Sequence, residues 1–176
     1  MAFSLYIKGP LRVKQFLSIF IFTFKEYFMS QSIHGKVLKL FISKKNNNAE
    51  TVTIEQNSIR LDAKGVLEDK FHGKDEHRAI LLSSYESYKI AKENNIEMPY
   101  GSLGENILMD INPYDLDVGH QLKIGNVTLE ITQNCTLCKG LSKVDPKAPK
   151  LLKNHRGIFA KTVTSGTILK DDKVTL

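Results

Sequence analysis

The sequence predicts a mainly β domain of the barrel or sandwich type, with one main helix and short peripheral helices. Short runs with strand-like alternation follow one another at close spacing through most of the chain. Only one segment carries a clear helix start signal. Strands and helices do not alternate as they do in a doubly wound sheet. A thioredoxin-like fold is therefore disfavoured, because its Cys-x-x-Cys follows an early strand and opens a helix.

The predicted strands are short and are separated by turn residues. Residues 49–55 show the pattern well, since Val52 and Ile54 alternate with threonine and glutamate. The polar stretch 44–48 is interpreted as a loop, residues 65–74 as an ordered turn region, and 58–63 as a continuation of the first sheet. In chain order the other predicted strands are 35–42, 79–82, 106–109, 121–124, 127–132, 157–163 and 173–176.

The main helix is predicted from a capping box. Ser83 is followed three residues later by Glu86, so each side chain satisfies a free backbone N–H of the first turn. Tyr85, Tyr88 and Ala91 are expected on roughly one face. The helix should end near Asn94.

The charge of the chain is moderate and divides between two parts. The chain has 176 residues and a net charge of +6, and residues 1–29 hold four basic residues against one acidic, which leaves +3 for residues 30–176. Nucleic-acid binding normally shows a dense basic patch, so we expect no nucleic-acid partner. The lysines between 139 and 161 are spread among proline and leucine and are interpreted as a solvated face.

Residues 1–29 are interpreted as an extension and residues 30–176 as the functional domain. The apolar run 16–24 resembles the core of a signal peptide, but no small-x-small cleavage site follows it. Nine residues are also too few for a bilayer span, which needs about 20. Translation from Met29 is the preferred interpretation, and a short interfacial anchor is the alternative. We expect a cytoplasmic domain with no integral membrane span.

Cys135 and Cys138 are the only cysteines and stand directly after a predicted strand. Two cysteines are too few for a disulfide scaffold. A thiolate can act as a nucleophile, a soft-metal ligand or a sulfur carrier. The spacing by itself leaves these three roles open.

Four segments place glycine beside charged or amide side chains, where backbone can approach a ligand and cations can bind oxyanions. They are 65–73 with Arg78, 101–106, the cysteine run, and 155–160. In this order they resemble the MOSC domain family, named for the C-terminal domain of molybdenum cofactor sulfurase. The matching residues are Gly65, Asp69, Gly73, Leu103-Gly104-Glu105-Asn106, Thr132-Gln133 with Cys138, and Arg156-Gly157-Ile158-Phe159.

The chain departs from the family pattern at two positions. Glu68 stands where the family often has glycine, and Asp171-Asp172 replaces a terminal Gly-Asp. The resemblance covers residues 32–176. It implies a barrel-like fold around a pocket.

The resemblance also implies a function: binding of the molybdenum cofactor, or carriage of sulfur as a cysteine persulfide. Some members reduce N-hydroxylated compounds with a separate reductase, and pyridoxal phosphate binding is also associated with the family. Cysteine desulfurase or a reductase is the expected partner. The implied functional thiol and metal ligand is Cys138. Cys135 is an additional thiol outside the family pattern and is the second catalytic candidate. The implied cofactor-binding residues are Asp69, Gly73, Arg78, Gly104, Glu105, Asn106, Arg156 and Gly157.

Several alternatives stay open. Cys135 either releases sulfur by forming a disulfide with Cys138 or merely packs. A zinc- or thiol-based binding module is the rival function, with His72 and His155 joining the cysteines as ligands. A thiol–disulfide oxidoreductase is the third. The four-cysteine pattern of a ferredoxin is absent, so a reductase role requires electrons from another protein.

Overall fold

The computed structural model describes residues 33–136 and 140–176. Contacts divide the chain into Met1–Ile33 and His34–Leu176. The apolar run 16–24 and Met29 lie outside the described residues, so the predicted extension stays a prediction. No helix in the described ranges has the length and apolar character needed to cross a membrane.

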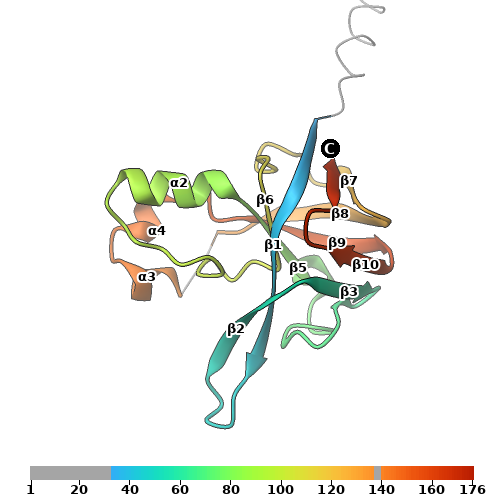
Figure 1. Cartoon of the computed structure of the whole chain (residues 1–176), viewed down its shortest axis with the longest axis horizontal. Helices are drawn as coiled ribbons and strands as arrows, with labels where there is room; N and C mark the ends of the chain where they lie inside the picture. The colour runs from blue at the N-terminus through green and yellow to red at the C-terminus, as the bar shows by residue number, and fades with distance from the viewer. Residues whose placement is uncertain (1–32, 137–139) are drawn as a thin grey trace, which may run out of the picture. The chain divides into compact units, whose positions relative to one another are not determined.

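Seven strands of the described chain close into a barrel, as the sequence predicts (Figure 1). Their order is β1–β11–β7–β8–β9–β5–β6, and β6 pairs back to β1. Only β5 and β6 run parallel, and the pairing of Gly35 with Val174 joins β1 to β11. Closure removes the free edges of an open sheet. The strands are β1 (His34–Lys45), β5 (Ile80–Ser84), β6 (Ile107–Met109), β7 (Gln121–Ile124), β8 (Val127–Asn134), β9 (Ile158–Thr164) and β11 (Lys173–Thr175).

The barrel interior follows the alternation read from the sequence. In β7, Leu122 and Ile124 are buried while Gln121 and Lys123 are exposed. In β8, Val127, Leu129 and Ile131 are buried in turn. Burying each such side chain contributes about 1.5–3 kcal/mol, so alternation fixes which face of each strand turns inward.

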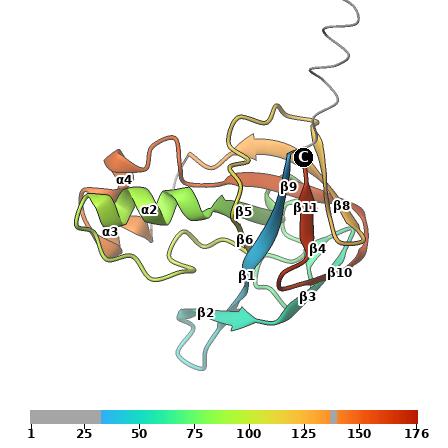
Figure 2. The same cartoon turned by 45° about the horizontal axis from the view of Figure 1, so that its top comes forward.

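Two further groups of strands stand outside the closed ring. Strand β2 (Thr51–Gln56) pairs with the second half of β1, and this arm extends beyond the barrel (Figures 1 and 2). Strands β3 (Ser58–Asp62), β4 (Gly65–Val66) and β10 (Gly166–Leu169) form a small second sheet. The prediction that 58–63 continues the first sheet is wrong, because β3 pairs with β10, more than a hundred residues later in the chain.

The main helix, α2 (Tyr85–Glu93), begins one residue later than predicted. Its cap is Ser84, which accepts the Glu86 N–H at 3.1 Å, whereas Ser83 is fully buried in β5. Tyr88 and Ala91 are buried, whereas Tyr85, which was expected on the same face, is 44% exposed. At about 100° per residue, Tyr85 lies about 120° around the helix from Ala91 and falls outside the buried face.

The predicted peripheral helices are present: η1 (Glu76–Arg78), α3 (Leu141–Val144) and α4 (Ala148–Leu151). Figures 1 and 2 show α2, α3 and α4 on the same side of the barrel. Leu141 and Leu152 pack with Tyr88 and Ala91 in a second apolar cluster. This cluster holds the chain that follows the cysteines against α2.

Candidate functional site

Segments far apart in the sequence line a pocket of about 810 Å³. They are the β1–β2 arm, residues 70–79, Leu81 of β5, residues 101–106, the chain at Cys135, residues 140–144 and Phe159 of β9. All four segments identified in the sequence therefore meet here, the last of them through Phe159. The volume lies within the range of small-molecule and cofactor sites.

Basic side chains outnumber acidic ones in the lining. The Lys70 ammonium donates to Thr51 Oγ1 at 2.8 Å, and partial burial lowers the Lys70 pKa from its ordinary value. The one lining carboxylate, Asp75, accepts the His77 N–H at 3.0 Å and caps η1. An excess of cations favours an anionic ligand. The basic residues that line the pocket are Lys70, Lys74, Arg78 and Lys143.

Two aromatic rings lie among these cations. Phe71 lines the pocket and is 48% exposed although it is large and apolar. The Nζ atoms of Lys70 and Lys74 lie 4.6 Å and 5.6 Å from its ring centroid. The Arg78 guanidinium lies 4.8 Å from the ring centroid of Phe159. A flat ring that carries negative charge therefore finds both stacking surfaces and cations here.

A β-bulge positions Arg78. Between Ile131 and Gln133 the register of β8 shifts, so Thr132 is the extra residue. Thr132 Oγ1 donates to the His77 carbonyl at 2.5 Å, and Gln133 Nε2 donates to the same carbonyl at 3.5 Å. The Thr-Gln pair thus holds η1, the turn that presents Arg78 to the pocket.

Asp69 and Asn106 support the wall of the pocket. Asp69 is 6% exposed and accepts three hydrogen bonds: from the N–H groups of Ser43 (2.6 Å) and Phe71 (2.8 Å), and from Asn106 Nδ2 (3.2 Å). Asn106 Oδ1 accepts the Leu81 N–H at 3.1 Å. Asn106 lines the pocket and Asp69 lies behind it.

Glu105 is buried behind the turn 101–106. Its Oε1 accepts from the Tyr88 hydroxyl and from the Gly101 N–H, the latter at 3.0 Å. Burial raises the Glu105 pKa to about 6, although the bond from Tyr88 opposes the rise. Burial and the neighbouring Glu105 carboxylate also raise the Tyr88 pKa. Glu105 therefore ties the turn to α2 and does not line the pocket.

Gly73 and Gly104, two of the three predicted glycine sites, differ in position. Gly104 lines the pocket with φ +80°, and a Cβ there would meet nothing within 4 Å. Gly73 has φ +71° and donates to the Lys64 carbonyl at 3.0 Å in a turn outside the lining. Both require the left-handed backbone that glycine adopts most readily.

Arg156 and Gly157 hold the chain at Cys135 and Thr136. The Arg156 guanidinium donates to the carbonyls of Thr136 and Pro149. Gly157 has φ +125°, and its carbonyl accepts the Cys135 N–H at 3.0 Å. Neither Arg156 nor Gly157 lines the pocket, so the structure places both beside the cysteine segment.

Cys135 is 6% exposed and lines the pocket. Cys138 lies outside the described residues. The histidines proposed as zinc ligands have other neighbours: His72 Nε2 lies 2.8 Å from Asp62 Oδ1, and the His155 ring packs edge-on against Tyr114. Within 33–136 and 140–176, no three histidine, cysteine or acidic residues are grouped to hold a metal.

Among the lining residues that sequence reasoning missed, the charged and aromatic ones with a direct bearing on ligand binding include Lys70, Phe71, Lys74 and Lys143. The first three lie in the turn region already singled out for its glycines, where cations alternate with an aromatic residue. That interleaving was a usable signal. No signal in the sequence indicates Lys143, because its position in the pocket depends on how α3 packs.

A family model described as MOSC domain matches residues 68–175. The solved structures similar to this chain include the YuaD protein from Bacillus subtilis, with 17% identity, 82% of this chain and 96% of that chain covered, and a TM-score of 0.71. YiiM from Geobacillus stearothermophilus also has 17% identity, over 81% of this chain and 75% of that one, at TM-score 0.62. YiiM from Escherichia coli has 17% identity, with 79% of this chain and 68% of that chain covered, and a TM-score of 0.59. A comparison with curated protein sequences gives no match.

Proposed function

This chain belongs to the MOSC domain family, and from that premise we propose that it binds the molybdenum cofactor in the pocket beside Cys135, with Cys138 as the functional thiol. One observation carries the proposal: four basic side chains surround a pocket of about 810 Å³ that has one lining carboxylate. Such a balance of charge suits a phosphorylated ligand.

The lining fits the parts of this cofactor. Lys70, Lys74 and Arg78 would hold its phosphate, and the rings of Phe71 and Phe159 would lie beside its flat ring system. When bound, the cofactor supplies redox chemistry at a metal held by its own dithiolene. The protein's part is to orient the ligand and keep the cations in place.

Persulfide carriage is the second candidate. Cys135 lies in a pocket rich in cations, which favour a thiolate. In the proposed step the Cys138 thiolate attacks the outer sulfur of a cysteine desulfurase persulfide. The new S–S bond forms as the old one breaks, and the desulfurase thiolate leaves. Attack of the Cys135 thiolate on Cys138 sulfur then forms a disulfide and releases hydrosulfide.

Cofactor content tests the first proposal. The full chain is purified from cells that make the molybdenum cofactor, and molybdenum and oxidised pterin are measured per protein. We expect both near one per chain, with a loss of at least tenfold in Lys74→Ala/Arg78→Ala. Lys123→Ala/Lys170→Ala removes the same charge from exposed positions away from the pocket lining and should change neither. Stoichiometric zinc with no molybdenum and no pterin would favour the zinc-module rival instead.

Mass spectrometry tests the second candidate. After incubation with a cysteine desulfurase and cysteine, we expect one added sulfur atom on Cys138. The addition should vanish in Cys138→Ser and persist in Cys135→Ser. Labelling that follows Cys135 instead would move the carrier role to that residue.

A further inference from the structure

The net positive charge of the domain is concentrated in the segment 140–157. Residues 30–176 carry 21 basic and 18 acidic residues, which is a net +3. Segment 140–157 has five basic residues against Asp145 alone, which is a net +4. The rest of the domain is therefore net −1. The lysines of this segment are among those interpreted from the sequence as a solvated face, and the structure leaves them exposed.

We use the name lysine face for four lysines that lie in or next to α3 and α4, two helices in contact with each other: Lys143, Lys147, Lys150 and Lys153. All four are exposed, and in the described part of the chain none has a carboxylate within 4.0 Å. Elsewhere Lys39 pairs with Glu55 at 2.7 Å, and Lys161 pairs with Glu130 at 2.9 Å. The lysine face therefore keeps its charge available to a partner.

The lysine face stands on a packed support beside the pocket. Leu141 and Leu152 are fully buried in the cluster with Tyr88 of α2, so α3 and α4 are held in place. Lys143 itself lines the pocket, and its neighbour Val144 lines it too. A molecule bound on the lysine face would border the pocket opening.

We propose that the lysine face docks a protein that presents clustered carboxylates. Among the large hydrophobic side chains that are exposed, none falls in 140–157, so the face has no apolar side to insert into a lipid surface. The segment also contains no phenylalanine, tyrosine or tryptophan to stack on bases. Charge complementarity with an acidic protein surface steers association and fixes orientation.

The position of the lysine face next to the pocket suggests what a docked partner would do. A partner seated on α3 and α4 delivers or collects sulfur or electrons next to the pocket. That role rests on the proposed function, whereas docking on the lysine face does not.

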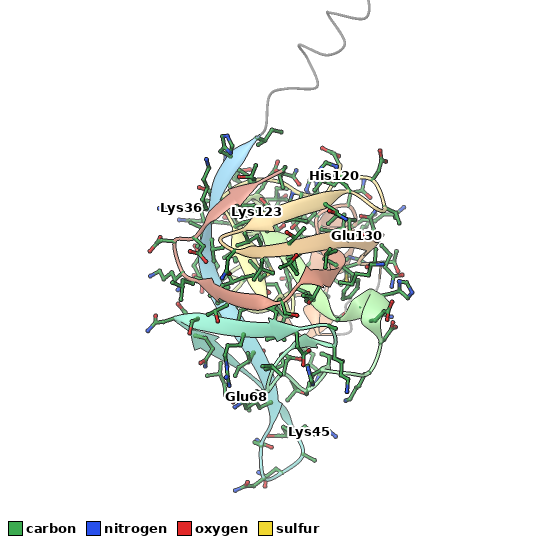
Figure 3. The ribbon with its side chains drawn as sticks, turned by 90° about the vertical axis from the view of Figure 1, so that its right-hand side faces the viewer. Lys36, Lys45, Glu68, His120, Lys123 and Glu130 are labelled. Carbon is green, nitrogen blue, oxygen red and sulfur yellow. The ribbon has the colours of Figure 1, made fainter. Side chains whose placement is uncertain are left out.

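Binding of a carboxylate polypeptide to the full chain tests the docking surface. The probe is fluorescent poly-L-glutamate, measured by anisotropy at 50 mM and 200 mM NaCl. We expect Lys147→Glu/Lys150→Glu/Lys153→Glu to weaken binding at least tenfold at low salt and to remove most of the salt dependence. The matched control, Lys123→Glu/Lys170→Glu/Lys173→Glu, changes the same charge at exposed positions outside 140–157, with Lys123 on a barrel strand (Figure 3). It should weaken binding less than threefold.

Three outcomes would overturn the proposal. One is an equal loss in both triple variants, which would show only a response to total charge. Another is tighter binding, at equal salt, of vesicles with 30% phosphatidylserine or of a 20-base-pair duplex, which would assign the face to a lipid surface or nucleic acid. The third is loss of probe binding in Lys74→Ala/Arg78→Ala, which would place the probe in the pocket. Failure of the cofactor test leaves these measurements unaffected, so the two proposals fail separately.

Discussion

The side-chain amide of Asn106 donates to Asp69 Oδ2 at 3.2 Å, joining two loops that lie 37 residues apart in the sequence. The same carboxylate holds the N–H groups of Ser43 and Phe71. Three segments around the pocket, at Ser43, at residues 69–71 and at Asn106, are thus connected through one buried acid. The two residues therefore fix the shape of the wall before any ligand binds.

Replacing Asp69 should lower the free energy of unfolding of the domain. Asp69→Ala leaves three donors without their acceptor in a buried site, and we expect a loss of about 3 kcal/mol in the free energy of unfolding. Denaturant titration measures it. Asp110→Ala is the matched control, because exposed Asp110 accepts one bond, from the Lys36 N–H at 2.7 Å; its cost should stay below about 1 kcal/mol. Equal effects would contradict the central role of Asp69.

Glu105 should make stability depend on pH. Its folded pKa of about 6 lies above the ordinary 4.5, so the folded state disfavours the charged form. This contribution is most favourable below about pH 4.5 and is lost as pH rises through about 6. The total is about 2 kcal/mol, from about 1.4 kcal/mol per pKa unit.

The variant Glu105→Gln isolates this effect. The unfolding free energy of the variant minus that of the wild type should rise by about 2 kcal/mol between about pH 4.5 and 7. Measuring the difference cancels the titration of the other carboxylates. A difference that stays constant across this range would show that Glu105 has an ordinary pKa.

The two departures from the family glycines both adopt left-handed backbone. Glu68 has φ +67° and Asp171 has φ +68°, so the conformation persists where glycine does not. Asp171→Gly should relieve this strain and stabilise the domain by about 0.5–1 kcal/mol. Glu68→Gly should also stabilise the domain, but by a smaller amount, because it removes the exposed ion pair of Glu68 with Lys44.

Thermal unfolding measures both glycine variants. Asp117→Gly provides the comparison, since Asp117 is exposed and does not have positive φ; it should leave the melting temperature unchanged or lower it. If Asp171→Gly lowers the melting temperature as much as Asp117→Gly does, strain at residue 171 is not significant.

Thr132 should act on ligand binding through Arg78. Thr132→Val keeps the shape of the side chain but removes its bond to the His77 carbonyl, so η1 and Arg78 lose a restraint. We expect cofactor content to fall about threefold to tenfold with less than about 1 kcal/mol of lost stability. Thr128→Val on the same strand should affect neither. A stability loss without a change in cofactor content would make Thr132 purely structural.

Local sequence patterns predicted much of the fold. Alternation predicted β7 and β8, and a short continuous apolar run predicted the buried β5, because strand period and burial are properties of neighbouring residues. The end of α2 at Asn94 was also predicted. The helix start was displaced by one residue, since Ser83 and Ser84 both suit a cap and only barrel packing assigns the former to β5.

The site was predicted less completely. The order of the glycine turns indicated the family and identified Arg78, Gly104 and Asn106, which line the pocket. Asp69, Glu105 and Arg156 were expected to touch the cofactor, whereas in the structure they bind backbone or a neighbouring side chain. A motif shows that a residue type is needed at a position. It does not show whether a charged side chain there contacts a ligand or holds the backbone, because both roles give the same motif.

By itself, the sequence determined the β architecture, the family and the set of chemically capable residues, because these depend on short-range periodicity and spacing. Only the tertiary structure decided which of those residues share a cavity. Barrel closure and the packing of α3 and α4 on α2 bring together side chains that are distant in the chain, such as Lys74 and Lys143. Such proximity comes from long-range pairing that no local pattern encodes.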